Sequence, residues 1–133
     1  MLVVDDDNGQ RMVLKIMLSK NGYQVDTAED GDDAVKAAHN VSYDIILMDG
    51  CMPNKTGLEA AEEIRADEAA KGLEMEDRSP FFILLFSNIS RNEWKSIHTT
   101  PNLALHVFQM HDYRSYRHLI KRVRYQVSGG GHV

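Results

Sequence analysis

At 133 residues the chain can bury one hydrophobic core without a second domain. Hydrophobic residues make up 43% and charged residues 26%, as in ordinary soluble proteins, and no apolar run is long enough to cross a bilayer, so we expect no membrane contact. The net charge is −5, and the single cysteine, Cys51, excludes an internal disulfide, so we expect a reducing, cytoplasmic location.

The chain opens with a short apolar run, Leu2 to Val4, which predicts a strand. It ends in three consecutive acids: Asp5, Asp6 and Asp7. Residues 8–21 carry apolar side chains at helical spacing, and Gly22 is suited to cap the end of a helix. We expect these apolar side chains, methionines included, to fill the core: Met12, Val13, Ile16 and Met17.

The next segments predict a strand, a helix and another strand. Residues 23–30 alternate as in a strand, and 31–40 has the pattern of a short helix. The apolar run 44–48 is again typical of a strand, and it ends in Asp49. After a loop that contains Pro53, Thr56 is suited to cap a helix whose inner face would hold Leu58, Ala61 and Ile64.

The second half continues this alternation. Residues 66–79 are polar, so we expect them to extend the helix and then form a surface loop. The continuous apolar run 81–86 predicts a central parallel strand covered on both faces. Ser90 and Glu93 have the spacing of a capping box, which indicates the start of a helix. We expect a fifth strand over 103–108 and a last helix with one face formed by Tyr113, Tyr116, Ile120 and Val123.

Five strand–helix units in succession predict an α/β domain over residues 1–126, with a doubly wound parallel sheet and helices on both faces. The Gly-rich residues 127–133 predict a flexible tail.

The acids at two strand ends predict a cation site. In an open parallel sheet, ligands bind beyond the carboxyl ends of the strands, where Asp6 and Asp49 would meet. Crowded carboxylates raise one another's pKa, and a divalent cation removes this cost. Mg²⁺ suits the pair because it accepts one or two carboxylates and keeps waters that phosphoryl oxygens can replace.

Several motifs occur together in this sequence: Val3-Val4-Asp5-Asp6, Leu47-Met48-Asp49, Met52-Pro53, Gly57 and Leu85-Phe86-Ser87. Their combination resembles the receiver domain of response regulators in two-component phosphorelays, over roughly residues 1–126. The resemblance implies a flavodoxin-like sheet in the order 2-1-3-4-5. It also implies a signalling domain rather than an enzyme, which takes a phosphoryl group from a histidine kinase or histidine phosphotransfer protein and passes the signal to an output protein or domain.

The resemblance further assigns roles to individual residues. Asp49 would accept the phosphoryl group, and Ser87 would hydrogen-bond one of its oxygens. His106 occupies the position of an aromatic switch residue in the face formed by the fourth helix, fifth strand and fifth helix, although a plain surface histidine is equally compatible. The expected protein ligands of Mg²⁺ are Asp5 (through water), Asp6, Asp49 and the backbone carbonyl of Cys51.

One family residue is replaced. Receivers place a lysine and then a proline at the end of the fifth strand, and the spacing puts Gln109 and Met110 there. No lysine occurs between Lys95 and Lys121. A glutamine amide can donate to a phosphoryl oxygen, but a charge-assisted hydrogen bond is roughly twice as strong as a neutral one. We therefore expect phosphotransfer to persist and the switch to be weakened.

Two other functions fit parts of the sequence. A pseudo-receiver would keep the fold as a protein-binding module without phosphorylation. The acids also resemble the Asp-x-Asp start of haloacid-dehalogenase-type phosphatases, with Asp5 as nucleophile and Asp7 as acid and base. Such enzymes need a downstream lysine and a later acidic pair, which this chain does not offer in a suitable strand-end context.

Basic residues gather near the end of the chain. No aromatic-rich or helix-turn-helix module accompanies them, so we interpret them as the solvent-facing side of a helix and expect no direct nucleic-acid binding. These residues are Arg114, Arg117, Lys121, Arg122 and Arg124.

Overall fold

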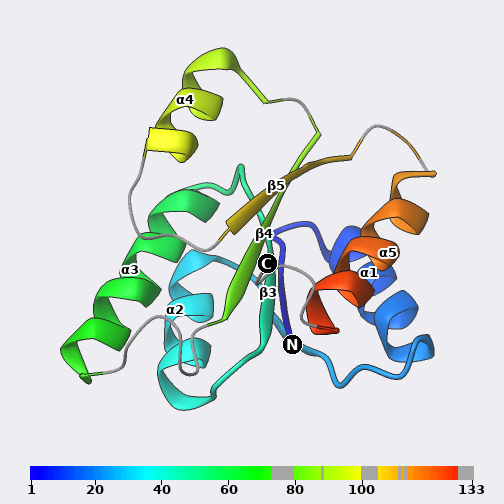
Figure 1. The fold of residues 1–133 in the computed structure, drawn as a ribbon, viewed down its shortest axis with the longest axis horizontal. Helices are drawn as coiled ribbons and strands as arrows, with labels where there is room; N and C mark the ends of the chain where they lie inside the picture. Colours follow the sequence, from blue (N-terminus) through cyan, green and yellow to red (C-terminus); the bar gives the residue numbers. More distant parts are fainter. Residues whose placement is uncertain (73–79, 88, 100–104, 111, 113, 129–133) are drawn as a thin grey trace.

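The computed structural model describes residues 1–72, 80–87, 89–99, 105–110, 112 and 114–128, which form a five-stranded parallel sheet flanked by helices (Figure 1). The strand order β2-β1-β3-β4-β5 confirms the predicted flavodoxin-like arrangement. In chain order the elements are β1 (Leu2–Val4), α1 (Asn8–Lys20), β2 (Asp26–Ala28), α2 (Gly31–Asn40), β3 (Ile45–Asp49), α3 (Gly57–Ala70), β4 (Phe81–Phe86), α4 (Arg91–Thr99), β5 (Leu105–Gln109) and α5 (Ser115–Val127).

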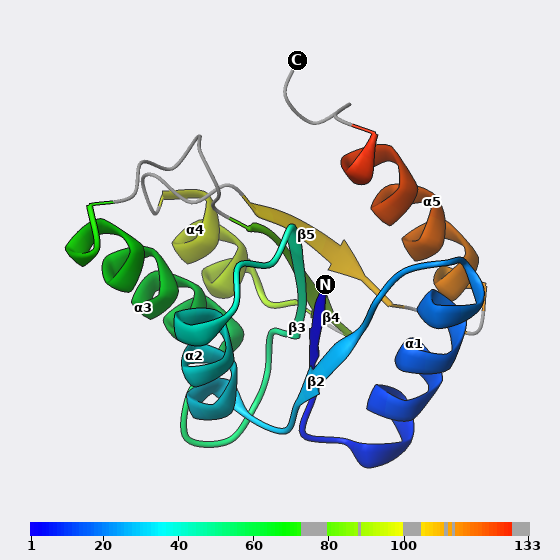
Figure 2. The same cartoon turned by 90° about the horizontal axis from the view of Figure 1, so that it is seen from below.

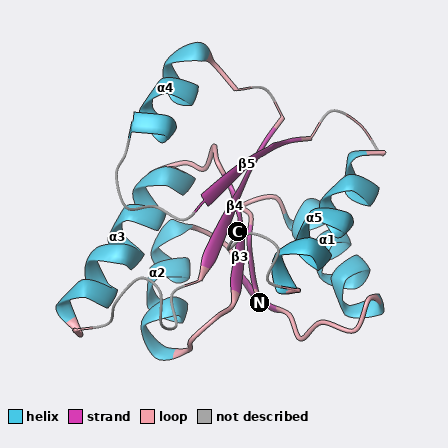
Figure 3. Cartoon of the chain, in the orientation of Figure 1, coloured by secondary structure: helices cyan, strands magenta, loops and turns pink. Residues whose placement is uncertain are grey.

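Helices cover both faces of the sheet, with α1 and α5 on one face and α2, α3 and α4 on the other (Figures 2 and 3). Alternate positions of β4 feed the two core clusters that result. Phe82, Leu84 and Phe86 pack beneath α2, α3 and α4. Ile83 and Leu85 pack beneath α1 and α5. All five are buried, as the continuous apolar run predicted for a strand covered on both faces.

Side chains cap the starts of four helices among the described residues, and Asp30 does so for α2 by accepting the Asp33 N–H. Asp7 caps α1 by accepting the backbone N–H of Gln10. Thr56 caps α3 as predicted, and its N–H donates in return to Glu59, which completes a capping box. The predicted box before α4 is confirmed as well: Ser90 accepts the Glu93 N–H at 3.1 Å, and the Glu93 carboxylate accepts the Ser90 N–H at 3.3 Å. The sequence signals at Thr56 and Ser90 therefore place the starts of α3 and α4 correctly.

The predicted inner face of α1 was wrong for three of its four residues. Leu14 and Leu18, four residues apart, are the buried residues of the helix. Met12 is 58% exposed, and Val13 and Ile16 are also exposed. Met17, by contrast, packs partly against the core as expected. Apolar residues extend around much of this helix, so their spacing alone does not show which side faces the sheet.

Two predicted strands differ in extent from those observed. β2 covers Asp26–Ala28 rather than residues 23–30, because it lies at the sheet edge and its only neighbour, β1, offers three residues for pairing. β5 continues one residue beyond its predicted end, to Gln109, where it pairs with Phe86.

Some expectations fall outside the described residues. These include the loop within 73–79, the predicted start of β5 at Leu103, and Tyr113. α5 ends at Val127, and the tail from residue 129 onward is not described, so its flexibility stays a prediction. No helix among the described residues has the length and apolar character needed to span a membrane.

Candidate functional site

The acids from two strand ends meet beyond the carboxyl ends of the parallel strands. β1 and β3 are parallel neighbours in register, with Val4 opposite Met48, so the residues that follow, Asp5 and Asp49, lie side by side. Carboxylate oxygens of Asp5, Asp6 and Asp49 all lie within 4.8 Å of one another. The structure thus brings together three of the four predicted metal-ligand residues by their side chains.

Burial and mutual repulsion disfavour ionisation of this cluster. Burial is the main cause that raises the pKa of Asp49 to about 7, and the negative charges of Asp5 and Asp6 add to the effect. The N–H of Cys51, 3.0 Å from an Asp49 oxygen, opposes the shift. The pKa of Asp5 is also raised, again mainly by burial. A small cluster of hard oxygen donors with a surplus of negative charge fits Mg²⁺, which would restore the ionised carboxylates.

The loop after β1 is held in place by its own polar groups. Asp5 accepts the Asp7 N–H at 2.9 Å, and the guanidinium of Arg11 donates to the Asp5 backbone carbonyl at 2.6 Å. Arg11 also bonds Asn8, and thereby ties the loop to the first turn of α1. Asp7 caps that helix, so its carboxylate is engaged away from the three-acid cluster.

The loop between β3 and α3 requires glycine at both ends. A Cβ on Gly50 would lie 2.2 Å from the ring of Phe86, and one on Gly57 would lie 2.5 Å from the backbone oxygen of Asp49. The Gly57 N–H donates to the Gly50 carbonyl at 3.2 Å, which closes the loop. Cys51 lies in this loop with its thiol exposed and 3.7 Å from a carboxylate oxygen of Glu93. Partial burial and the Glu93 charge raise the pKa of the thiol, which disfavours a reactive thiolate.

Ser87 and Gln109 lie at the carboxyl ends of β4 and β5, on the same side of the sheet as the acids. Ser87 directly follows β4, Gln109 ends β5 opposite Phe86, and both side chains are exposed. The Met110 N–H donates to the Phe86 carbonyl at 2.7 Å, which extends the pairing beyond Gln109. Within the described part of the chain, neither Ser87 nor Gln109 hydrogen-bonds Asp49. Among the described residues, the charged groups that shift the pKa of Asp49 are two acids, Asp5 and Asp6.

His106 is half-buried on β5, opposite Ile83. Its ring centroid lies 6.4 Å from that of Phe108, and its pKa is lowered by burial and by the charge of Arg122 on α5. The imidazole is therefore biased toward its neutral form, and the proposed switch position faces α5.

Sequence reasoning missed three side chains near the site: Arg11, Lys55 and Glu93 in its contact with Cys51. Arg11 follows the helix cap by one turn, so the helical spacing was a usable signal. The other two make contacts between elements far apart in sequence, for which no local pattern exists.

The protein-family model that describes the response regulator receiver domain matches residues 1–74, more than half of the chain. The chain belongs to this family, so it is a receiver domain of two-component signalling systems, and the resemblance drawn from the sequence is confirmed.

The segments that this chain matches are parts of longer regulators and kinases. The chain is 40% identical over 68 residues to the transcriptional regulatory protein ResD of Bacillus subtilis, which covers 51% of the chain and 28% of ResD. It is 42% identical over 67 residues to histidine kinase 5 of Arabidopsis thaliana, which covers 50% of the chain and 7% of the kinase. The chain thus spans less than a third of the length of these relatives.

Solved structures resemble nearly the whole chain. The response regulator TrrA of Thermotoga maritima, in complex with Mg²⁺-BeF, aligns with a TM-score of 0.72 and 30% identity over 94% of this chain and 96% of TrrA. The receiver domain of the sensor histidine kinase PA1611 of Pseudomonas aeruginosa, with magnesium coordinated in its active-site cleft, aligns with a TM-score of 0.67 and 28% identity over 90% of each chain.

Proposed function

We propose that this receiver domain accepts a phosphoryl group on Asp49 from a histidine kinase or a histidine phosphotransfer protein, with Mg²⁺ held by the acid cluster. The observation that carries the proposal is the meeting of Asp5, Asp6 and Asp49 oxygens within 4.8 Å at the ligand-binding edge of the sheet. Magnesium in the structurally similar TrrA and PA1611 receivers supports the choice of ion.

Asp6 and Asp49 would hold the ion directly, Asp5 through water, and Cys51 through its backbone carbonyl. When bound, Mg²⁺ supplies positive charge that offsets the charge of the transferring phosphoryl group. An Asp49 oxygen forms the new bond to phosphorus while the nitrogen–phosphorus bond of the donor histidine breaks. Asp49 must be ionised to attack, and with a pKa of about 7 it is only partly ionised near neutral pH until a cation binds.

Output would depend on the second half of the domain. Ser87 would donate to a phosphoryl oxygen, and Gln109 would offer a neutral amide where receivers use an ammonium group. The signal would pass to an output protein or domain through the α4, β5 and α5 face, which includes His106. The weaker neutral contact leads us to propose a weakened switch in a domain that works in the cytoplasm.

A pseudo-receiver that binds partners without phosphorylation is the second candidate. The observation that favours it is that, among the described residues, the charged groups that shift the pKa of Asp49 are acids. The phosphatase alternative has less support, since it needs Asp7 as acid and base, whereas Asp7 caps α1 and Asp5 clusters with Asp49 instead.

Acetyl phosphate with Mg²⁺ tests the proposal, with phosphate-affinity electrophoresis as the readout. We expect one phosphate, which Asp49→Asn abolishes and Asp7→Asn retains. A phosphate that survives Asp49→Asn but is lost in Asp5→Asn would favour the phosphatase. Absence of phosphate from a folded, Mg²⁺-binding parent chain would favour the pseudo-receiver.

A further inference from the structure

Lys55 joins the loop between β3 and α3 to two helices. Its ammonium lies 2.9 Å from a carboxylate oxygen of Asp32, in the first turn of α2, and it also pairs with Glu63 on α3. The lysine side chain is only 17% exposed, although both acids are largely open to solvent. Hydrogen bonds to Glu63 and then Asp32 raise the pKa of Lys55, so it stays charged at neutral pH.

The stem of Lys55 is packed as closely as its ammonium is paired. A Cβ placed on Gly31, the first residue of α2, would lie 3.0 to 3.1 Å from three carbons of the Lys55 side chain. The methylene groups therefore cover the start of α2 while the ammonium reaches the two acids. Removal of the ammonium would leave Asp32 and Glu63 without the cation between them.

The same short loop serves the metal centre. It begins directly after Asp49, contains Cys51, and is closed by the hydrogen bond from the Gly57 N–H to the Gly50 carbonyl. Met52 anchors it in the core. Lys55 adds an ion-paired attachment on the side of α2 and α3.

We propose that Lys55 is a positioning residue for the metal centre: by tying the loop to Asp32 and Glu63, it fixes the backbone of Cys51 for Mg²⁺. The inference rests on the proposed function, because it assumes that Asp49 and the Cys51 carbonyl hold the ion. It adds a residue that touches neither metal nor phosphate and acts through the loop.

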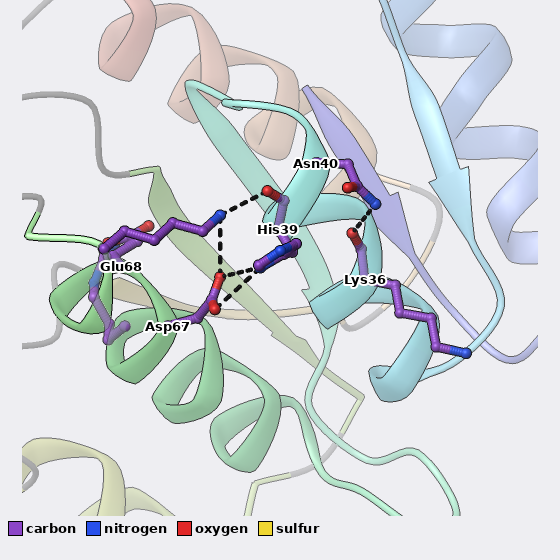
Figure 4. A network of polar contacts seen from close by, with 7 residues as sticks. Lys36, His39, Asn40, Asp67 and Glu68 are labelled. Atoms are coloured by element: carbon purple, nitrogen blue, oxygen red, sulfur yellow. Dashed lines mark hydrogen bonds and ion pairs between the residues drawn. The ribbon is translucent and has the colours of Figure 1, made fainter.

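A matched control lies at the other end of the same two helices. There Lys71 donates to the His39 carbonyl at 2.7 Å and lies 3.4 Å from Asp67. Asp67 also contacts the His39 ring at 2.9 Å (Figure 4). This network joins α2 to α3 with similar chemistry, but its residues lie outside the loop that carries Cys51. Lys71→Met therefore removes a helix-joining ammonium and leaves that loop intact.

The test compares Mg²⁺ affinity, by calorimetry, in the parent chain, Lys55→Met, Lys55→Arg and Lys71→Met. Lys55→Met should bind Mg²⁺ roughly tenfold more weakly, at the low end of the cost of removing a group behind a metal ligand. Lys55→Arg should regain most of the affinity because it can pair with both acids. Lys71→Met should bind like the parent, even where its melting temperature falls as much as that of Lys55→Met.

Hydrogen exchange without metal gives an independent readout. The Gly57 amide, which closes the loop, should exchange faster in Lys55→Met than in the parent or in Lys71→Met. If Lys55→Met fails to fold, Asp32→Asn and Glu63→Gln each weaken the attachment while the lysine is kept, and each should lower the Mg²⁺ affinity by part of that amount.

A parent chain that does not bind Mg²⁺ would overturn the proposed function itself. A parent that binds, with Lys55→Met binding equally well and exchanging equally slowly at Gly57, would overturn only the role of Lys55. Equal losses in Lys55→Met and Lys71→Met would also overturn it, because they would indicate general loosening of the helices.

Discussion

The two halves of this domain differ in what they share with other receivers. Residues 1–74, from β1 through α3, match the family model and contain every proposed metal ligand. The second half, from β4 onward, lies beyond that match, although the solved structure of TrrA aligns with 94% of the chain. The fold therefore continues where the sequence likeness fades, and the second half holds Ser87, the proposed phosphoryl contact, and Gln109, the proposed site of the replaced lysine.

Burial explains how the fold continues. β4 is held by buried apolar side chains on both faces, and this requires only hydrophobic residues of suitable size. Ser87 and Gln109 lie beyond the core at strand ends, where their side chains are exposed. A change at such a position costs little stability, so chemistry there can vary while the sheet stays intact.

The largest expected effect is on Mg²⁺ affinity, which should depend on residues of the first half and not on those of the second. Asp6→Ala should weaken Mg²⁺ binding more than the roughly 10- to 100-fold typical of supporting residues, because it removes a direct ligand. Ser87→Ala is the control from the second half and should bind Mg²⁺ like the parent. Calorimetry measures both, and an Asp6→Ala variant that binds as tightly as the parent would refute the metal centre.

Restoring the lysine should bring the second half closer to other receivers. Gln109→Lys adds a charged donor, and such a hydrogen bond is worth about 1.5–3 kcal/mol. Phosphorylation by acetyl phosphate should become faster, and the new ammonium should lower the pKa of Asp49 from about 7. NMR with a beryllofluoride mimic should show larger amide shifts in α4 and near His106 than in the parent. Equal shifts in parent and variant would mean that Gln109 is not what weakens the switch.

The acid cluster should also make stability depend on pH. Without metal, the folded-state pKa of Asp49, about 7, exceeds the usual value of 3.8 for an unfolded chain. The folded chain binds more protons between these values, so this contribution to stability is present below about pH 4 and is lost as pH rises through 7. Asp49→Asn should remove the loss and raise the free energy of unfolding at pH 8 by on the order of 1 kcal/mol, after allowance for solvent screening.

Thermal melts of Asp49→Asn and the parent at pH 5 and pH 8 test this sign. Saturating Mg²⁺ should abolish the difference in the parent, because the cation keeps the carboxylates ionised. If the parent without metal were more stable at pH 8 than at pH 5, and Asp49→Asn showed the same pH dependence, the raised pKa of Asp49 would not be what makes stability depend on pH.

The smallest expected effect concerns Met12 on α1, the helix whose buried side the sequence analysis predicted wrongly. Met12→Ala should change the free energy of unfolding by less than about 0.5 kcal/mol, because the side chain is exposed. Leu14→Ala, two positions along, should cost about 2–5 kcal/mol. Denaturant unfolding of both variants would show whether Leu14 indeed faces the core, and similar losses would contradict the observed helix orientation.

Sequence reasoning succeeded where a local signal decides the structure. Capping residues indicate where two helices start, namely Thr56 for α3 and the pair Ser90 and Glu93 for α4. The continuous apolar run of β4 indicates that this strand is covered on both faces of the sheet. It failed for α1, where several faces are apolar and tertiary packing decides which is buried. At the site, the acids were visible because they end strands, whereas the pairing of Lys55 with Asp32 and Glu63 depends on how α2 and α3 lie side by side.

The pairing of β1 with β3 would make the proposed metal centre depend on the native fold. Asp5 and Asp49 are far apart in the chain and meet only when Val4 lies opposite Met48. An unfolded chain therefore lacks the site, and any cation that binds there draws the population toward the native state by mass action. At a free concentration one hundred times its Kd, that shift amounts to about 2.7 kcal/mol. The cellular supply of Mg²⁺ would then influence the lifetime of the domain as well as its chemistry.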